Sequence, residues 1–267
     1  MYAEFYGLTA RPFQLTPDAR FFFESTVHRQ AMAYLVYGLH HAEGFIIVTG
    51  EVGAGKTILV DNLLSTIDRT TFVAAKIVTT HLAGDDLLHM VAAGFGVAKE
   101  GLTKGSLLQR ISDFALSQHR SGKRLLLIID EAQNLSFEAL EELRMLSNIV
   151  LDRTMVLQSF LLGQPQFRTI LASPRLEQLR QRVTAAYHLG PLSEAEGRAY
   201  VEHRLRRATS RTIFRSRLLP RQSIARIGTV SRRGLCATPR GSSIFSPRGR
   251  LRQPFSSWAG LHSDILP

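Results

Sequence analysis

The most constraining feature of the sequence is a glycine-rich segment, GEVGAGKT, at residues 50–57. It lies between the apolar run FIIV at 45–48 and a segment whose leucine and isoleucine residues recur at helical spacing, 58–67. A strand, a glycine-rich turn and a helix in this order are typical of a phosphate-binding loop. Glycines let backbone N–H groups converge on an anion, and the helix N-terminus adds a favourable dipole. The segment therefore predicts an α/β fold that holds a phosphate chain.

The side chains of this loop indicate a nucleotide with a metal ion. Lys56 would reach the β and γ phosphates of ATP, and the hydroxyl of Thr57 would bind Mg2+. The other loop positions would contribute mainly backbone atoms. The predicted nucleotide-binding residues are Gly50, Glu51, Val52, Gly53, Ala54, Gly55, Lys56, Thr57 and, from a second segment, Asp130.

That second segment is RLLLIID at 124–130, which is apolar at every position between its two charged ends. A strand that is apolar on both faces suits the interior of a parallel sheet. Asp130 at its end would bind the Mg2+ hydration shell, so Thr57 and Asp130 are the predicted metal residues. Glu131 could orient or deprotonate the attacking water; the alternative is that it only caps a turn.

Three further residues are candidates for catalysis together with Glu131. Gln164 follows the predicted strand 154–163, where its amide could contact the γ phosphate or the water, or serve as a turn residue before Pro165. Arg180 and Arg182 precede the next strand. Either arginine could stabilise charge on the transferred phosphoryl group from a neighbouring subunit, or belong to a solvated helix face.

Alternating strand and helix patterns run from residue 45 to 208 and predict an open parallel sheet covered on both faces by helices. We predict strands near 71–78, 124–130, 154–163 and 185–192, and helices near 85–95, 105–122, 136–149 and 194–208. The Ser193 and Glu196 pair has capping-box spacing. The predicted domains are an N-terminal linker and helix at 1–44, an ATPase core at 45–208 and a tail at 209–267.

Charge divides the chain at the same place. Residues 1–208 carry 22 Lys and Arg against 21 Asp and Glu, whereas 209–267 carry 11 Arg, no Lys and one acidic residue, Asp264. The net charge of +11 therefore belongs almost entirely to the tail, which also holds five of the ten prolines. A basic tail leaves nucleic acid open as a partner, although the balanced core does not favour it.

No signal peptide and no apolar run of about 18 residues is found in the sequence, and there is a single cysteine, Cys236. We expect a cytoplasmic protein without a transmembrane segment; peripheral association with the inner membrane is the alternative. The aromatic N-terminus could be ordinary core or could wall an adenine ring. We interpret His40 and His41 as helix-end residues. The aromatic residues concerned are Phe5, Tyr6, Phe13, Phe21, Phe22 and Phe23.

Seven segments occur in an order and spacing that resemble the ExeA-like AAA+ ATPases of the general secretion pathway A type: FYGLTARPFQLTPDARFFF, HRQAMAYLVYGL, GEVGAGKT, LIIDEAQNL, LLGQP, LRQRV and YVEHRL. The resemblance covers residues 1 to about 208 and is greatest to the branch associated with the XrtA exosortase and PEP-CTERM system. It implies a P-loop NTPase fold of AAA+ type. Lys56 and Thr57 match Walker A, Asp130 and Glu131 match Walker B, and Gln164 matches sensor 1. Arg182, or alternatively Arg180, matches the arginine-finger region.

The resemblance further implies a homo-oligomeric ATPase, in a ring or another arrangement, that assists secretion or assembly of exopolysaccharide and other cell-envelope components. After residue 208 the family continues into a helical lid with a Gly-x-Pro-Arg segment, which this chain lacks. The tail is either a frameshift product, a basic arm or a divergent domain. The alternative functions are a DNA-associated transposition helper that uses the tail as an arm, and a nucleotide-binding switch that does not hydrolyse ATP.

Overall fold

The computed structural model describes residues 8–14, 18–41, 44–79, 84–99 and 101–209. The predictions for the tail after Thr209, for the replaced lid and for Phe5, Tyr6 and Cys236 lie outside these residues. The domain boundaries after residues 44 and 208 stay predictions.

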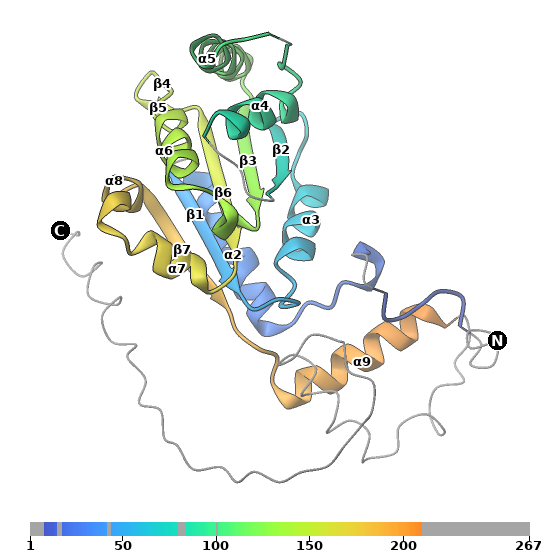
Figure 1. The fold of residues 1–267 in the computed structure, drawn as a ribbon. Helices are drawn as coiled ribbons and strands as arrows, with labels where there is room; N and C mark the ends of the chain where they lie inside the picture. The colour runs from blue at the N-terminus through green and yellow to red at the C-terminus, as the bar shows by residue number, and fades with distance from the viewer. Residues whose placement is uncertain (1–7, 15–17, 42–43, 80–83, 100, 210–267) are drawn as a thin grey trace, which may run out of the picture. The chain divides into compact units, whose positions relative to one another are not determined.

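A five-stranded sheet forms the centre of the fold, with the strand order β2-β3-β6-β1-β7 (Figure 1). All four strand pairs are parallel, as the alternating sequence pattern predicts. Parallel strands require crossover connections, so their carboxyl ends meet at one edge of the sheet. The strands are β1 (Phe45–Gly50), β2 (Phe72–Val78), β3 (Arg124–Asp130), β6 (Leu157–Gly163) and β7 (Val183–Leu189).

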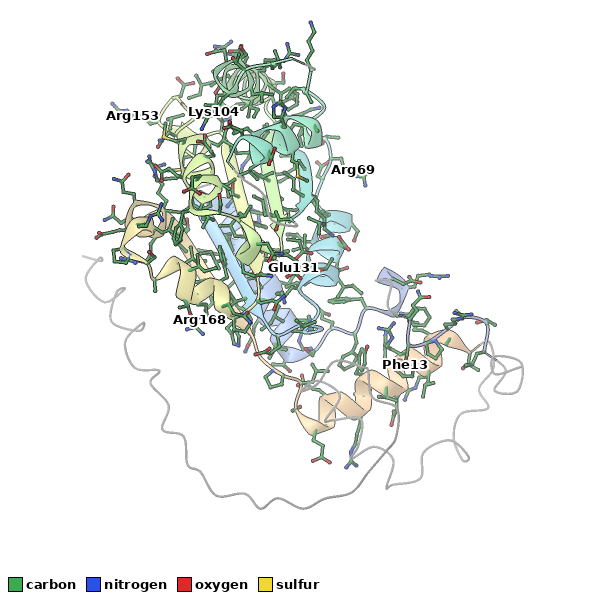
Figure 2. All side chains as sticks on the ribbon, in the orientation of Figure 1. Phe13, Arg69, Lys104, Glu131, Arg153 and Arg168 are labelled. Atoms are coloured by element: carbon green, nitrogen blue, oxygen red, sulfur yellow. The ribbon has the colours of Figure 1, made fainter. Side chains whose placement is uncertain are left out.

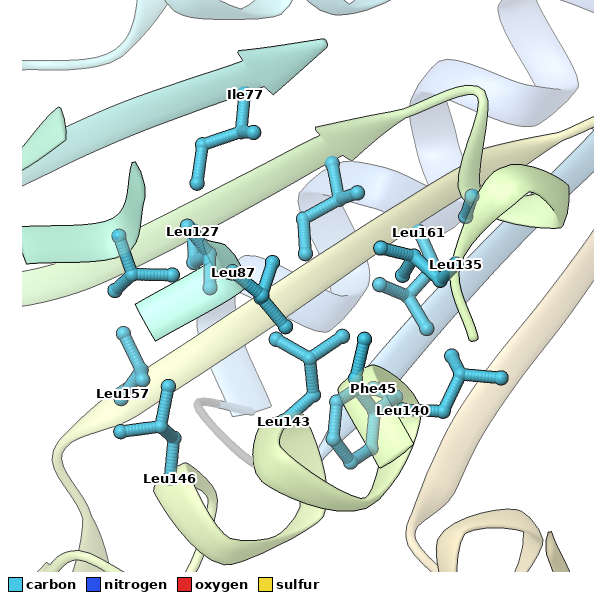
Figure 3. Packing of buried hydrophobic residues seen from close by; sticks show 14 of the residues in the cluster. Phe45, Ile77, Leu87, Leu127, Leu135, Leu140, Leu143, Leu146, Leu157 and Leu161 are labelled. Atoms are coloured by element: carbon cyan, nitrogen blue, oxygen red, sulfur yellow. The ribbon is translucent and has the colours of Figure 1, made fainter. Parts of the chain in front are cut away.

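Helices cover both faces, because alternate residues of the central strands point to two separate apolar cores. In β3, Leu125, Leu127 and Ile129 belong to one core, whereas Leu126 and Ile128 belong to the other. The larger core is completed by α4 (Gly84–Gly94), α5 (Lys104–Arg120), α6 (Phe137–Leu146) and α7 (Gln166–Leu171), and part of it is drawn in Figure 3. The smaller core is completed by α2 (Thr26–His41) and α3 (Lys56–Thr66).

One predicted element is wrong in part. The segment 154–163 is not one strand: β5 (Thr154–Met155) pairs antiparallel with β4 (Val150–Leu151), and the sheet strand β6 begins only at Leu157. The two-residue turn between β4 and β5 has positive φ at both Asp152 (51°) and Arg153 (65°). Positive φ at both central residues is the pattern of a type I′ hairpin turn, which normally selects Asn or Gly, so the residue types of this segment do not predict the turn.

The other described elements are helical and lie at several points along the chain. They are α8 (Glu177–Arg180), α9 (Glu194–Ala208) and the short 3-10 helices η1 (Ala19–Phe21), η2 (Ala132–Asn134) and η3 (Pro174–Leu176). The capping box of Ser193 and Glu196 at the start of α9 is confirmed. None of the described helices combines the length and the apolar character needed to cross a bilayer.

The N-terminal segment is packed on α9. Thr9 donates its backbone N–H to the carbonyl of Ala208 at 2.7 Å. The guanidinium of Arg204 lies 5.9 Å from the ring centroid of Phe13, 5.2 Å from that of Phe21 and 5.5 Å from that of Tyr200. Phe21 is buried, whereas Phe13, labelled in Figure 2, is exposed. Part of the aromatic N-terminus therefore serves as core, as one of the two predicted roles requires.

Candidate functional site

The loop between β1 and α3 is shaped by two glycines with positive φ. Gly53 has φ 79° and Gly55 has φ 92°, both in the left-handed region that glycine adopts without a steric penalty. Gly55 is also the residue before the first turn of α3, and no side chain caps this helix. The first N–H groups of a helix have no partner within the helix, so an uncapped N-terminus after a glycine-rich turn suits a phosphate group.

Lys56 lies over this loop. Its ammonium group is buried and donates hydrogen bonds to the carbonyl of Gly50 at 2.7 Å and to that of Glu51 at 3.0 Å. Burial lowers the pKa of Lys56, while the carboxylates of Glu131, Asp130 and Glu51 act in the opposite direction. The cation is therefore held at the mouth of the loop by backbone oxygens.

The two predicted metal residues are in direct contact. The hydroxyl of Thr57 donates to Oδ2 of Asp130 at 2.6 Å, although the two residues are 73 positions apart in the chain. Asp130 is buried at the carboxyl end of β3, and its Oδ1 accepts the backbone N–H of Glu131 at 3.0 Å. A hydroxyl and a carboxylate oxygen are the ligand types that Mg2+ prefers, so this pair fits such an ion.

Glu131 has a backbone conformation that is rare for a residue with a side chain. Its φ of 57° and ψ of 41° place it in the left-handed region. Thr79, which follows β2, faces this turn: its hydroxyl lies 3.0 Å from the carbonyl of Asp130 and 2.7 Å from that of Glu131. Strained turns of this kind persist where surrounding contacts hold them, and they cluster at functional sites.

Two amides hold the carboxylate of Glu131. The side-chain N–H groups of Gln133 and of Gln164 both donate to Oε2, the latter at 3.0 Å, and the backbone N–H of Gln164 donates to Oε1 of Gln133 at 2.9 Å. Burial raises the pKa of Glu131, but the two amides and the charge of Lys56 outweigh it, so the pKa is lowered from its ordinary value. Glu131 is therefore an ionised, weakly basic carboxylate at neutral pH.

The predicted residues of β1, β3 and β6 thus gather at one edge of the sheet, whereas the two arginines do not join them. Arg182 donates to the carbonyl of Ser147 at 3.3 Å and to its hydroxyl at 3.0 Å, at the end of α6. Arg180 donates to the carbonyl of Leu171 at 3.4 Å, at the end of α7. Both guanidinium groups bind carbonyls of the last turn of a helix, where a cation is favourable.

Sequence reasoning missed three residues that contact this site: His28, Thr79 and Gln133. Gln133 is part of the DEAQN segment, so its proximity to Glu131 could have been suspected from spacing alone. His28 of α2 lies beneath the loop, and its Nε2 is 3.1 Å from the carbonyl of Ala54. Nothing in the sequence near His28 indicates that contact, because it depends on how α2 packs beside β1.

A family described as "AAA domain" matches residues 39–171, which run from the end of α2 through α7 and contain residues 50–57, Asp130, Glu131 and Gln164. The chain is also 40% identical over 206 residues to general secretion pathway protein A of Aeromonas hydrophila. That alignment covers 77% of this chain but only 38% of the relative, so the chain spans about two fifths of the relative's length.

Two archaeal proteins of known structure have a similar fold. The ORC2 protein of Aeropyrum pernix, solved with ADPNP and ADP, matches with a TM-score of 0.58 and 17% identity over 81% of this chain and 60% of its own. CDC6P of Pyrobaculum aerophilum matches with a TM-score of 0.57 and 16% identity over 74% and 55%, respectively. At such low identity these matches concern the fold. Residues 39–171 match an AAA domain, and the chain has the α/β fold of AAA+ P-loop NTPases.

Proposed function

We propose that this protein binds ATP with Mg2+ at residues 50–57 and Asp130 and hydrolyses it with the help of Glu131 and Gln164. The observation that carries the proposal is the 2.6 Å contact between Thr57 and Asp130, which joins the glycine-rich loop to the acidic strand end. A shared cation explains why a hydroxyl and a carboxylate meet beside an uncapped helix N-terminus.

Each side chain of the cluster has a chemical task in this proposal. Lys56 would exchange its bonds to the loop carbonyls for phosphate oxygens. Bound Mg2+ would neutralise phosphate charge. Since the pKa of Glu131 is lowered, its carboxylate would accept a hydrogen bond from the attacking water and orient it rather than remove its proton in a separate step. Gln164, 3.0 Å from Glu131, would donate to the water or to the γ phosphate.

The central test is nucleotide binding by Lys56→Ala. The wild type should bind a fluorescent ATP analogue, and the variant should lose at least about 100-fold in affinity, because a buried charge-assisted contact is removed. Lys76→Ala is the matched control, since Lys76 of β2 pairs with Asp61 of α3 and not with the glycine-rich loop. If Lys56→Ala binds as tightly as the wild type, the loop does not hold the nucleotide.

Hydrolysis and simple switching differ in one measurement. Phosphate release at saturating ATP should be present in the wild type and absent in Glu131→Gln, while both proteins bind ATP. Equal phosphate release in the two proteins, at the background rate, would favour the alternative of a switch that binds nucleotide without hydrolysing it.

We further propose that the active form is a homo-oligomer in which Arg182, or alternatively Arg180, acts on the nucleotide of a neighbouring subunit. Arg182 would have to release Ser147 to do so. Specific ATPase activity should then rise with protein concentration. Mixing Arg182→Ala with Glu131→Gln subunits should restore activity, because each variant supplies what the other lacks. If neither Arg182→Ala nor Arg180→Ala changes turnover, the two arginines have no part in the mechanism.

At the level of the cell, we propose a role in secretion or in assembly of exopolysaccharide and other cell-envelope components, at the cytoplasmic side of the inner membrane. The proposal is supported by similarity to general secretion pathway protein A and by the seven motifs that resemble the XrtA/PEP-CTERM branch. Deletion of the gene in its source organism should reduce export of envelope polysaccharide. Wild type should restore it, and Lys56→Ala should not.

A second candidate function, a DNA-associated helper, has one feature in its favour: the net charge of +10 on residues 209–267. Neutralising several phosphates would make DNA affinity fall steeply with salt. The full chain should then bind duplex DNA at low salt, and removal of residues 210–267 should abolish binding. Absence of salt-sensitive binding by the full chain would exclude this function.

A further inference from the structure

His28 is a buried histidine whose two ring nitrogens both have partners. Nε2 is 3.1 Å from the carbonyl oxygen of Ala54, and Nδ1 is 2.7 Å from the hydroxyl of Ser25. A carbonyl can only accept, so Nε2 carries the hydrogen and Nδ1 accepts from Ser25. Burial lowers the pKa of His28, which favours this neutral form. His28 therefore presents one fixed donor to the glycine-rich loop.

The loop is in close contact with this ring at a second point. A Cβ added at Gly55 would lie 2.6 Å from Nε2 of His28. His28 thus supports the carbonyl of Ala54 and fills the space beneath Gly55, the two residues that precede Lys56. The orientation of the first N–H groups of α3 depends on the peptide units at these positions.

The start of α2, which carries His28, is bound to the start of α9 by one carboxylate. Oε1 of Glu196 accepts the backbone N–H of Thr26 at 2.8 Å, and Oε2 accepts the backbone N–H and hydroxyl of Ser193 at 3.2 and 2.9 Å. The hydrogen bonds from Thr26 and Ser193 lower the pKa of Glu196 to about 2. The carboxylate therefore binds first-turn groups of two helices at once.

We propose that His28 is a positioning residue for the phosphate-binding loop and that, through Thr26 and Glu196, it connects this loop to α9. This inference rests on the proposed function, since it assigns a regulation to the same site. A shift of α9 moves the start of α2, which moves the donor beneath Ala54 and changes the alignment of the loop N–H groups. Nucleotide affinity therefore depends on residues that do not touch the nucleotide.

Two substitutions of similar size separate positioning from packing. In His28→Gln, the amide N–H reaches about as far as Nε2 and can still donate to Ala54, whereas in His28→Asn it reaches only about as far as Nδ1. His28→Ala and His28→Asn should weaken ADP and ATP-analogue binding about tenfold, and His28→Gln should stay within about threefold of the wild type. His89→Gln, on the exposed side of α4, is the matched control.

A substitution at Glu196 tests the connection to α9. Glu196→Ala should weaken binding about threefold, and combining it with His28→Ala should add little, because both changes interrupt the same path. Fully additive losses would overturn the connection to α9, while equal affinity of the Gln and Asn variants of His28 would overturn the positioning role. If His28→Ala does not fold, the Gln and Asn variants carry the test.

Hydrogen exchange in the nucleotide-free protein keeps this inference separate from the proposed function. Amides of residues 53–58 should exchange about tenfold faster in His28→Asn than in His28→Gln or the wild type, while β1 stays protected. Faster exchange with no nucleotide binding by the wild type would leave the positioning role standing and remove the proposed function. Unchanged exchange in His28→Asn would overturn the positioning role, whatever the nucleotide result.

Discussion

Two loops at the same edge of the sheet differ in the type of residue that they place in the left-handed region of backbone conformation. The loop after β1 uses glycines at its left-handed positions, Gly53 and Gly55, whereas the loop after β3 places Glu131 in the left-handed region at φ 57°. Glycine adopts this conformation without penalty, while a residue with a side chain adopts it at a cost of about 1–3 kcal/mol. The first loop presents its backbone, and the second presents a carboxylate.

The difference shows which atoms of each loop matter for the proposed chemistry. In the first loop a side chain at Gly55 would obstruct the turn, because His28 occupies the space. In the second loop the side chain is needed, so the strain is retained and is held by Thr79, Gln133 and Gln164. A side chain added at Gly55 and the loss of the carboxylate at Glu131 should therefore have different effects on the protein.

The largest effect is expected from Glu131→Gln. The backbone strain stays, but the amide cannot orient water as a carboxylate does, so turnover should fall at least about 100-fold. Affinity for ATP should change less than about threefold. Steady-state phosphate release and equilibrium titration measure the two quantities. A variant that retains more than a tenth of wild-type turnover would show that Glu131 only supports the turn.

The second-largest effect is a loss of nucleotide affinity when either glycine of the first loop is replaced, and the loss should differ between Gly53 and Gly55. Gly55→Ala should lower nucleotide affinity at least about 30-fold, because the new Cβ meets His28 and φ is positive. Gly53→Ala meets no atom within 4 Å and carries only the φ penalty, so about three- to tenfold is expected. Titration with the same ADP analogue compares them, and equal losses would show that the space beneath Gly55 is irrelevant.

A smaller effect, of opposite sign, is expected where strain has no proposed role. Arg153 is exposed in the β4–β5 turn with φ 65°, so Arg153→Gly should stabilise the fold by about 0.5–1 kcal/mol and leave turnover unchanged. Thermal and urea unfolding measure the change. A loss of activity in this variant would show that the β4–β5 hairpin also contributes to turnover.

The smallest effect concerns pH. The folded-state pKa of Glu131 is lowered, so its ionised form stabilises the fold above its ordinary pKa of about 4.5, and this contribution is lost as pH falls through the folded-state pKa. Gln164→Ala removes one donor to that carboxylate. Its stability deficit relative to wild type should be present at pH 7 and shrink below about pH 4. A deficit that is constant from pH 7 to pH 3 would contradict the charge-dependent role.

The sequence was most informative where topology limits the outcome. In a parallel sheet, polar residues that follow buried strands must meet at one edge, so the proximity of Thr57, Asp130 and Gln164 could be predicted. The β4–β5 hairpin could not, since neither Asp152 nor Arg153 is a typical residue for such a turn. His28 and Thr79 escaped prediction because their contacts with the loops bridge 26 and 52 residues.

The antiparallel bridge between Leu8 and Thr209 brings the two ends of residues 8–209 together. A domain whose ends are adjacent can be attached to other segments, or placed within a longer chain, at a single point on its surface without separating its strands. Such an attachment point would sit beside α9, which the Thr9 to Ala208 hydrogen bond also joins. At its other end the same helix, α9, is connected to α2 by the hydrogen bond from the backbone N–H of Thr26 to Glu196.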